Sequence, residues 1–274
     1  MPWFFARIDR RMRKMRPLLD CAKVAAFEAA TIILRNFNTE LDVMEKSSNN
    51  LVTRADLESE EMILSSIRKI FPGHSFLAEE NHPAQPTMPE HLWIIDPLDG
   101  TTNFVHGIPH FCISIAYAHH GEVKMGLVYD PLREELFTAI AEEGAFLNDK
   151  KIGVSQSGAL NKSVIATGFY YDRGALMEKT LETIHALFKQ NIRDMRRTGS
   201  AALDMCWVAC GRFDGYFEYL LSPWDFSAAM LIVCEAGGVC VDKTGGPLGV
   251  QSGSVVASNA AISGEFLKSV EWKE

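Results

Sequence analysis

The 274-residue chain predicts a layered α/β protein of the α+β kind. Apolar residues recur at helical spacing up to Ile70, short β-like runs joined by turns follow, and strands and helices then alternate to the C-terminus. A chain of this length buries roughly 70–75% of its unfolded surface and needs no disulfide scaffold. With 47% hydrophobic residues, 23% charged residues and a mean hydropathy of -0.01, its composition excludes disordered and fibrous classes.

The first half begins with two predicted helices and continues as a sheet. Pro17 suits the first turn of a helix, and apolar residues then recur at helical spacing to about Asn36. Asp56 is predicted as the N-cap of a second helix, which Phe71-Pro72-Gly73 ends. The predicted strands are Ser75–Ala78, Leu92–Ile95, Cys112–Tyr117, Lys124–Tyr129 and Leu136–Ile140. Turns such as His120-Gly121-Glu122 favour hairpins between them.

The second half is expected to form another sheet with helices on its faces. The predicted elements are a strand at Val164–Gly168, helices near Ala175–Lys189 and Ala201–Cys210, a strand at Gly215–Tyr219, a helix at Asp225–Ala236, strands at Gly238–Val241 and Val255–Ala257, and a last helix. We therefore divide the chain into a basic arm (1–16), an N-terminal half (17–152) and a C-terminal half (153–274). The seam lies near Gly153–Ala159, and both halves are expected to form one compact unit.

Charge and cysteine usage limit the partners and the compartment. The formal charge of -8 has the wrong sign for a protein that binds nucleic acid over its whole surface, so any contact with nucleic acid must be local. The six cysteines have neither the paired spacing of a zinc site nor the density of a secreted scaffold. We expect them to be reduced core residues of a cytoplasmic protein. No run of 18 uncharged apolar residues predicts a membrane span.

The arm carries aromatic residues followed by basic ones, from Arg7 to Arg16, which is the reverse order of a signal peptide. Such an arm can contact anionic lipid or RNA. A solvated tail, or translation that starts at Met12 or Met15, is the simpler explanation, and we favour it.

The segment Trp93–Phe104 carries the chemistry. A hydrophobic strand delivers Asp96 and Asp99 at its C-terminal end, and the chain then turns through Gly100 into a short helix. Hard cations such as Mg²⁺ prefer carboxylate and carbonyl oxygens, and backbone N–H groups at a helix N-terminus hold phosphate. The segment therefore predicts a site for a divalent metal and a phosphate.

Three further acids stand at the ends of predicted elements, where a ligand is held rigidly: Glu79, Glu80 and Asp225. No protein nucleophile is evident, because the chain has neither a Cys-x₅-Arg loop nor a Gly-x-Ser-x-Gly elbow before a helix. Two metal ions can instead activate water. A covalent aspartyl-phosphate on Asp96 is the strongest rival, but the Asp-x-x-Asp spacing favours direct attack by water.

Several separate blocks, in one order, carry a resemblance that runs from about Pro17 to the last helix. They are Lys46–Ser48, Leu51–Asp56, Ala78–Glu80, Trp93–Phe104, Gly199–Ala202 and Pro223–Asp225 through Glu235–Gly238. In these blocks the sequence resembles the inositol monophosphatase family. The resemblance implies an αβαβα sandwich of the inositol monophosphatase and fructose bisphosphatase type. It also implies an Mg²⁺-dependent, lithium-sensitive phosphomonoesterase that is usually a homodimer.

The resemblance also implies roles for individual residues. The implied ligands of two to three Mg²⁺ ions are Glu79, Asp96, Leu98 through its carbonyl, Asp99 and Asp225. The implied catalytic residues are Glu79, Asp56 and Thr101, and of these Asp56 and Thr101 resemble the pair that orients the attacking water. The implied substrate-binding residues are Asp99, Gly100, Thr101, Ser200, Ala201 and Glu218, with the Gly100 and Thr101 amides as the phosphate cradle.

Some residues depart from the family or carry open alternatives. The loop between Lys46 and Asp56 is about one residue shorter than in animal members, which puts the affinity for a third ion in doubt. Arg196 or Arg197 reaches a second substrate phosphate, or pairs with surface acids across a dimer interface. His106 and His110 have the spacing of a metal pair, but we favour packing or surface roles.

The resemblance makes inositol 1-phosphate the first expected substrate, within the class of small polyol and sugar phosphates. The alternatives within the family are fructose 1,6-bisphosphate and the 3′-phosphate of a nucleotide. A hypothesis from another class is a partner of the transcription machinery that acts independently of catalysis, as some bacterial relatives do, assisted by the arm Arg7–Arg16.

Overall fold

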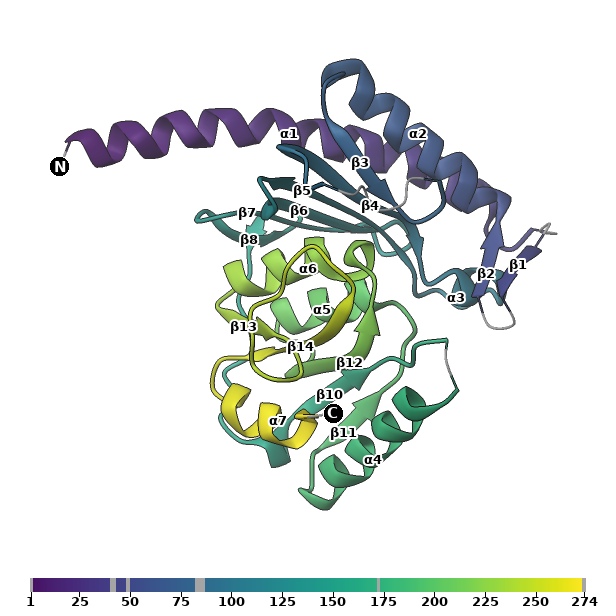
Figure 1. The fold of residues 1–274 in the computed structure, drawn as a ribbon, viewed down its shortest axis with the longest axis vertical. Helices are drawn as coiled ribbons and strands as arrows, with labels where there is room; N and C mark the ends of the chain where they lie inside the picture. The colour runs from purple at the N-terminus through teal and green to yellow at the C-terminus, as the bar shows by residue number, and fades with distance from the viewer. Residues whose placement is uncertain (1, 40–42, 48–49, 82–86, 172, 273–274) are drawn as a thin grey trace.

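The computed structural model describes all residues except 1, 40–42, 48–49, 82–86, 172 and 273–274, and leaves the side chains of 1–14 and 40–50 undescribed. Its helices and sheets stack in the order αβαβα (Figure 1). The sandwich architecture expected from the resemblance is therefore confirmed.

The first layer consists of α1 (Pro2–Asn36) and α2 (Arg54–Ile70), which cover the outer face of the larger sheet (Figure 1). The start predicted for α1 was wrong, because the helix begins at Pro2 and Pro17 lies inside it. Proline is preferred in a first turn because it has no N–H to donate, but a long helix can lose one such bond. The N-terminal end of α1 projects beyond the sheet.

The start of α2 also differs from the prediction. Thr53 is the N-cap: its hydroxyl accepts a hydrogen bond from the Ala55 amide at 3.1 Å. Asp56 is the third helical residue, and its carboxylate accepts the Thr53 amide at 2.8 Å. Each of the two side chains therefore accepts a hydrogen bond from a backbone amide at the start of the helix, which is a reciprocal capping arrangement. The predicted end at Phe71 is confirmed.

The larger sheet has the strand order β3-β4-β5-β6-β7-β8-β9. Its strands are β3 (Ser75–Ala78), β4 (His91–Asp99), β5 (Cys112–His119), β6 (Glu122–Asp130), β7 (Glu135–Ile140), β8 (Gly144–Leu147) and β9 (Lys150–Lys151). Only the β3–β4 pair is parallel. All five predicted strands are present, whereas β8, β9 and the separate hairpin of β1 (Val43–Ser47) and β2 (Asn50–Thr53) were not predicted.

The smaller sheet is mixed, with the order β11-β10-β12-β14-β13. Its strands are β10 (Val164–Thr167), β11 (Asp194–Arg196), β12 (Gly215–Leu221), β13 (Gly238–Val241) and β14 (Gly253–Asn259). The short edge strand β11 was not predicted, because three residues carry too little periodicity.

Two helices lie between the sheets, α5 (Ala201–Ala209) and α6 (Pro223–Glu235) (Figure 1). They are buried on nearly all sides, so neither has a polar face of the usual width. The approach to the larger sheet is close: a Cβ on Gly126 of β6 would lie 2.5 Å from the Ala228 carbonyl oxygen of α6. A side chain at this position would push the layers apart.

The last layer consists of α4 (Ala175–Lys189) and α7 (Ser263–Val270), which pack on the outer face of the smaller sheet. The short helices α3 (Thr101–Val105) and η1 (Leu160–Lys162) complete the fold. The helices predicted for the second half of the chain correspond to α4, α5, α6 and α7. Their observed ends differ by up to two residues from the predicted ones, where ends were predicted.

All six cysteines are free. Burial is confirmed for Cys21, Cys112 and Cys206. Cys210 and Cys240 are half-buried, and Cys234, near the C-terminal end of α6, is exposed. In the part of the chain that is described, no helix combines the length and the apolar character needed to cross a bilayer.

Candidate active site

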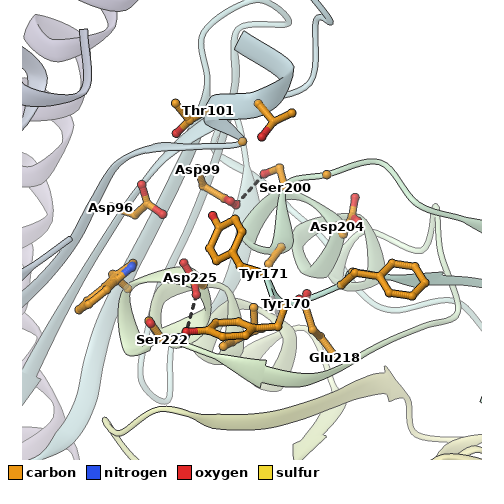
Figure 2. Close-up of a pocket in the computed structure, with 18 of the residues that line it drawn as sticks. Asp96, Asp99, Thr101, Tyr170, Tyr171, Ser200, Asp204, Glu218, Ser222 and Asp225 are labelled. Atoms are coloured by element: carbon orange, nitrogen blue, oxygen red, sulfur yellow. Dashed lines mark hydrogen bonds between the residues drawn. The ribbon is translucent and has the colours of Figure 1, made fainter. Parts of the chain in front are cut away.

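A pocket of about 280 Å³ opens where the C-terminal ends of β3 and β4 meet the N-terminal ends of α5 and α6. Its walls contain the site residues predicted from the sequence, with the exceptions of Asp56 and Glu80: Glu79, Asp96, Leu98, Asp99, Gly100, Thr101, Ser200, Ala201, Glu218 and Asp225. Figure 2 shows Asp96 and Asp99 on the β4 side and Asp225 on the α6 side. Glu80 is not among the lining residues.

Three aspartates share one arrangement in this pocket. Asp96 accepts the Leu98 amide at 2.9 Å, Asp225 accepts the Ser222 amide at 2.7 Å, and Asp99 accepts the Ser200 hydroxyl at 2.7 Å and the Ala202 amide at 2.8 Å. In each case a single oxygen takes the bonds, and among the described residues no hydrogen bond reaches the second oxygen. Each carboxylate is thus fixed in orientation and retains an oxygen for a ligand.

Burial raises the pKa values of all three aspartates, and the charges of nearby acids add to the shift. Loss of solvent and then the charges of neighbouring acids hold the pKa values of Asp96 and Asp225 well above the usual range. Desolvation raises the pKa of Asp99 to about 6, although Ser200 and Ala202 oppose the shift. Crowded carboxylates with a free oxygen each are the donor set that a hard divalent cation prefers, and its charge removes their repulsion. The residues therefore fit Mg²⁺.

Near the end of β4, an irregularity in the sheet lies between Asp96 and Asp99. The pairing of β4 with β5 shifts between these two residues, where Pro97 removes an amide from the ladder. Gly100 follows with a φ of 98°, and a Cβ there would lie 3.0 Å from the His110 carbonyl oxygen. The chain can turn into α3 at this point only because residue 100 has no side chain.

Asp56 lies behind the pocket and reaches it through Thr101. The Thr101 hydroxyl lies 3.0 Å from Asp56 Oδ1 and 3.1 Å from the Leu98 carbonyl oxygen. Asp56 is buried, and its other oxygen accepts the amide and the hydroxyl of Thr53. Desolvation raises the pKa of Asp56 to about 6. The capping residues of α2 therefore also connect this helix to the pocket.

Glu79 follows β3 in a turn that α2 holds in place. The carboxylate of Glu60, a fully buried residue of α2, accepts the Glu80 amide at 2.8 Å and the Asn81 amide at 3.0 Å. It also accepts the side-chain amide of Asn81 at 3.1 Å. Sequence reasoning did not identify Glu60, because its role depends on the contact between α2 and the end of β3.

The opposite wall of the pocket carries Glu218 on β12. Burial raises the pKa of Glu218 to about 7, and the Tyr216 hydroxyl, which donates to it at 2.6 Å, opposes the shift. Gly168 leaves room for this carboxylate, since a Cβ there would lie 2.0 Å from Glu218 Oε2. Glu218 is therefore held where a polar substrate group can meet it.

Sequence reasoning missed Tyr171 and Asp204, which also line the pocket. The Tyr171 ring points toward the aspartates from the loop after β10 (Figure 2). Desolvation and then the charges of the acids raise its pKa well above the usual range. Asp204 of α5 is buried and lies 3.2 Å from Nε2 of His110. Only the folded chain brings these segments together.

The structure distinguishes between the alternatives that the sequence left open for two arginines and two histidines. Arg196 pairs with Asp194 at 2.6 Å on its own strand, whereas Arg197 lines the pocket. His110 is buried against Asp204, and His106 is exposed, so packing and surface roles are confirmed for this pair.

A five-layer αβαβα sandwich with an acidic pocket between its sheets defines the fold class of inositol monophosphatases and fructose bisphosphatases. The chain belongs to the inositol monophosphatase family, whose sequence profile matches residues 14–273. It is 43% identical over 259 residues to Nus factor SuhB of Pasteurella multocida, an alignment that covers 94% of this chain and 97% of that protein.

Two solved structures are also similar. The extragenic suppressor protein suhB of Bartonella henselae has a TM-score of 0.88 and 35% identity, covering 94% of this chain and 100% of that one. The inositol monophosphatase of Anabaena has a TM-score of 0.84 and 38% identity, covering 94% and 96% respectively.

Proposed function

We propose that this chain hydrolyses a phosphomonoester, with Mg²⁺ held in the acidic pocket and water as the nucleophile. The observation that carries the proposal is the arrangement of Asp96, Asp99 and Asp225, each fixed by one oxygen and open at the other. Family membership supports the same reaction class. Glu79 and the Leu98 carbonyl complete the ligand set that we propose for two to three ions.

If bound by these carboxylates, Mg²⁺ would supply neutralisation of the phosphate charge, a more acidic water and stabilisation of the leaving alkoxide. The protein side chains orient that water. When the single proton of Thr101 points to Asp56, the lone pairs of the Thr101 oxygen can accept a hydrogen bond from the water. Asp56, with a pKa near 6, suits the acceptance of a proton at neutral pH. Glu79 is proposed to orient the same water.

A small polyol or sugar phosphate is the proposed substrate class, with inositol 1-phosphate as the first candidate. The Gly100 and Thr101 amides are proposed to hold its phosphate, and Glu218, Ser200 and Ala201 its hydroxyl groups. Arg197 is the group that would favour a second phosphate, as in fructose 1,6-bisphosphate. A nucleotide 3′-phosphate is the remaining alternative.

The reaction is tested by phosphate release from metal-stripped protein with and without Mg²⁺, across these three substrates and glycerol 2-phosphate. We expect turnover only with Mg²⁺, inhibition by Li⁺, and a loss of about 10²–10³ in kcat for Asp99→Asn. Asp130→Asn is the matched control, because Asp130 is also buried but bonds Leu132 and Arg133 away from the pocket. Normal turnover in Asp99→Asn would refute the metal assignment.

The polyol assignment has its own test. Glu218→Gln keeps the shape of the side chain but cannot accept hydrogen bonds on both ends, so we expect kcat/KM to fall more for inositol 1-phosphate than for an aryl phosphate without hydroxyls. Equal losses on both substrates would remove Glu218 from substrate recognition.

A second function, as a partner in a transcription complex, is favoured by the comparisons over that of a dedicated inositol 1-phosphatase. The Pasteurella relative carries the name Nus factor SuhB, and its similarity extends over nearly the whole chain. The basic arm of α1 is the segment that we propose to assist such a contact; its side chains up to Lys14 lie outside the described residues. The six free cysteines support a cytoplasmic location for either function.

This second function predicts a partner that survives the loss of activity. Asp99→Asn protein, used as bait, should recover the same transcription protein or RNA as the wild type. A chain without residues 2–14 is the comparison for the arm. Recovery of neither partner by the intact chain would exclude this function. The homodimer expected from the resemblance is tested on the same preparations by sedimentation.

A further inference from the structure

Four of the chain's eight histidines gather at the end of the larger sheet that lies away from the pocket: His74, His91, His119 and His120. Their neighbour is Glu90, which precedes β4. Because β4 runs for eight residue steps from His91 to Asp99, its two ends are separated by roughly 26 Å. The histidine group is therefore separate from the acidic pocket.

Two of these histidines and Glu90 have potential metal-ligating atoms close together. One such atom each from Glu90, His119 and His120 lies within 4.8 Å of the other two. Glu90 Oε1 lies 3.9 Å from Nε2 of His120, and 3.7 Å from Nε2 of a fourth side chain, His91. Glu90 and His120 are exposed, whereas His119 and His91 are half-buried. Small rotations of the two exposed side chains are enough to bring the ligand atoms to the spacing required around one cation.

The backbone prepares this arrangement. The His120 amide donates to the Glu90 carbonyl at 2.9 Å, and Nδ1 of His119 lies 3.1 Å from the same oxygen. His120 has a φ of 50°, and Gly121 follows with a φ of 79°, as a tight hairpin between β5 and β6 requires. The hairpin tip is thereby fixed against the residue that supplies the carboxylate.

The hydrogen bonds also set the histidine tautomers. A carbonyl only accepts, so Nδ1 of His119 carries the proton and Nε2 is the lone-pair donor. Nδ1 of His91 lies 2.6 Å from the Tyr117 hydroxyl, which can accept a hydrogen bond from a protonated Nδ1 and so leave Nε2 with a lone pair as well. Ligating histidines in metal sites are commonly oriented through their second nitrogen in this way.

We propose that Glu90, His119 and His120, with His91 as a fourth donor, bind a transition-metal cation of the Zn²⁺ type. Imidazole and carboxylate donors suit Zn²⁺, Co²⁺ and Ni²⁺, whereas the all-oxygen pocket suits Mg²⁺. The bound cation links the start of β4 to the β5–β6 hairpin. This site is independent of the reaction proposed for the pocket.

The test is a titration of metal-stripped protein with Zn²⁺ against a chromophoric chelator, in excess Mg²⁺ to occupy the pocket. Co²⁺ in place of Zn²⁺ gives visible bands that report nitrogen ligands. We expect one Zn²⁺ per chain, and at least about a tenfold loss of affinity in the double variant His119→Ala, His120→Ala. Asp99→Asn should bind Zn²⁺ as the wild type does.

The matched control is the double variant His106→Ala, His185→Ala, which removes two exposed histidines outside the group. It should keep the wild-type affinity and the Co²⁺ bands. The proposal is overturned if Zn²⁺ does not bind in excess Mg²⁺, or if the His119 and His120 variant binds it as tightly as the control does. Unchanged thermal unfolding of both metal-free variants shows that the comparison is between folded proteins.

Discussion

Single carboxylates act at different distances from the reacting phosphate. Asp99 is proposed to touch the metal directly, whereas Glu60 does not line the pocket and holds the backbone of the turn that carries Glu79. A residue of this second kind should alter metal affinity and leave the chemical step nearly intact. Partners that orient metal ligands typically contribute 10–100-fold to affinity.

We therefore expect Glu60→Gln to raise the Mg²⁺ concentration for half-maximal activity by about 10–100-fold, with kcat at saturating Mg²⁺ nearly unchanged. Glutamine keeps only one acceptor oxygen, so either the bond from the Glu80 amide or the bonds from Asn81 are lost, and an NH₂ group then faces those donors. Activity measured as a function of Mg²⁺ checks this. Glu61→Gln, one residue along and exposed, is the control. A loss of kcat without a change in Mg²⁺ dependence would place Glu60 in the chemical step instead.

At the scale of elements, the start of α2 combines stability with function. Thr53→Ala removes the N-cap hydroxyl and should lower the free energy of unfolding by about 1 kcal/mol. Because Thr53 also donates to Asp56, the substitution should reduce kcat as well. Thr53→Ser keeps the hydroxyl and should restore both. Urea unfolding and turnover, measured on the same samples, test both variants. A loss of stability with full activity would show that the N-cap of α2 does not influence the pocket.

The elements also show what sequence alone can predict. Helices and strands with several periodic apolar residues, such as α4 and β3, were predicted with their observed ends. The short strands β8, β9 and β11, which lie at or next to a sheet edge, were not, because their pairing depends on neighbours in space. The start of α1 was misjudged because proline is favoured in a first turn yet tolerated within a long helix.

The candidate site divides in the same way. Asp96 and Asp99 are recognisable because the motif around them is contiguous along one strand and turn. Glu60, Tyr171 and Asp204 come from three separate segments, and their positions depend on how α2, the loop after β10 and α5 pack. Local sequence carries no signal for such long-range contacts.

For the whole molecule, the acidic pocket makes stability depend on pH and on metal. Asp56 and Asp99 have folded pKa values near 6, above the ordinary 3.8. A raised carboxyl pKa means that the fold favours the protonated form. The contribution of these groups is therefore full below pH 3.8 and is lost as the pH rises through 6. Without metal, ionised aspartates destabilise the fold at neutral pH.

Mg²⁺ should reverse this effect only where the carboxylates are ionised. At 100 times its Kd, a ligand adds about 2.7 kcal/mol, or about 5–10 °C in Tm for a chain of this size. We expect a shift of that order at pH 7.5 and a much smaller one at pH 5, where protons compete for the same oxygens. Thermal unfolding with Mg²⁺, compared with NaCl of equal ionic strength, measures it.

Asp99→Asn provides the internal control for this linkage. Without metal at pH 7.5 the variant should be more stable than the wild type, because one of the crowded negative charges is gone, and the difference should vanish below pH 5. With Mg²⁺ the order should reverse, since the variant lacks a ligand. A metal-free variant that is less stable than the wild type at pH 7.5 would mean that the bonds to Ser200 and Ala202 outweigh the repulsion between the acids.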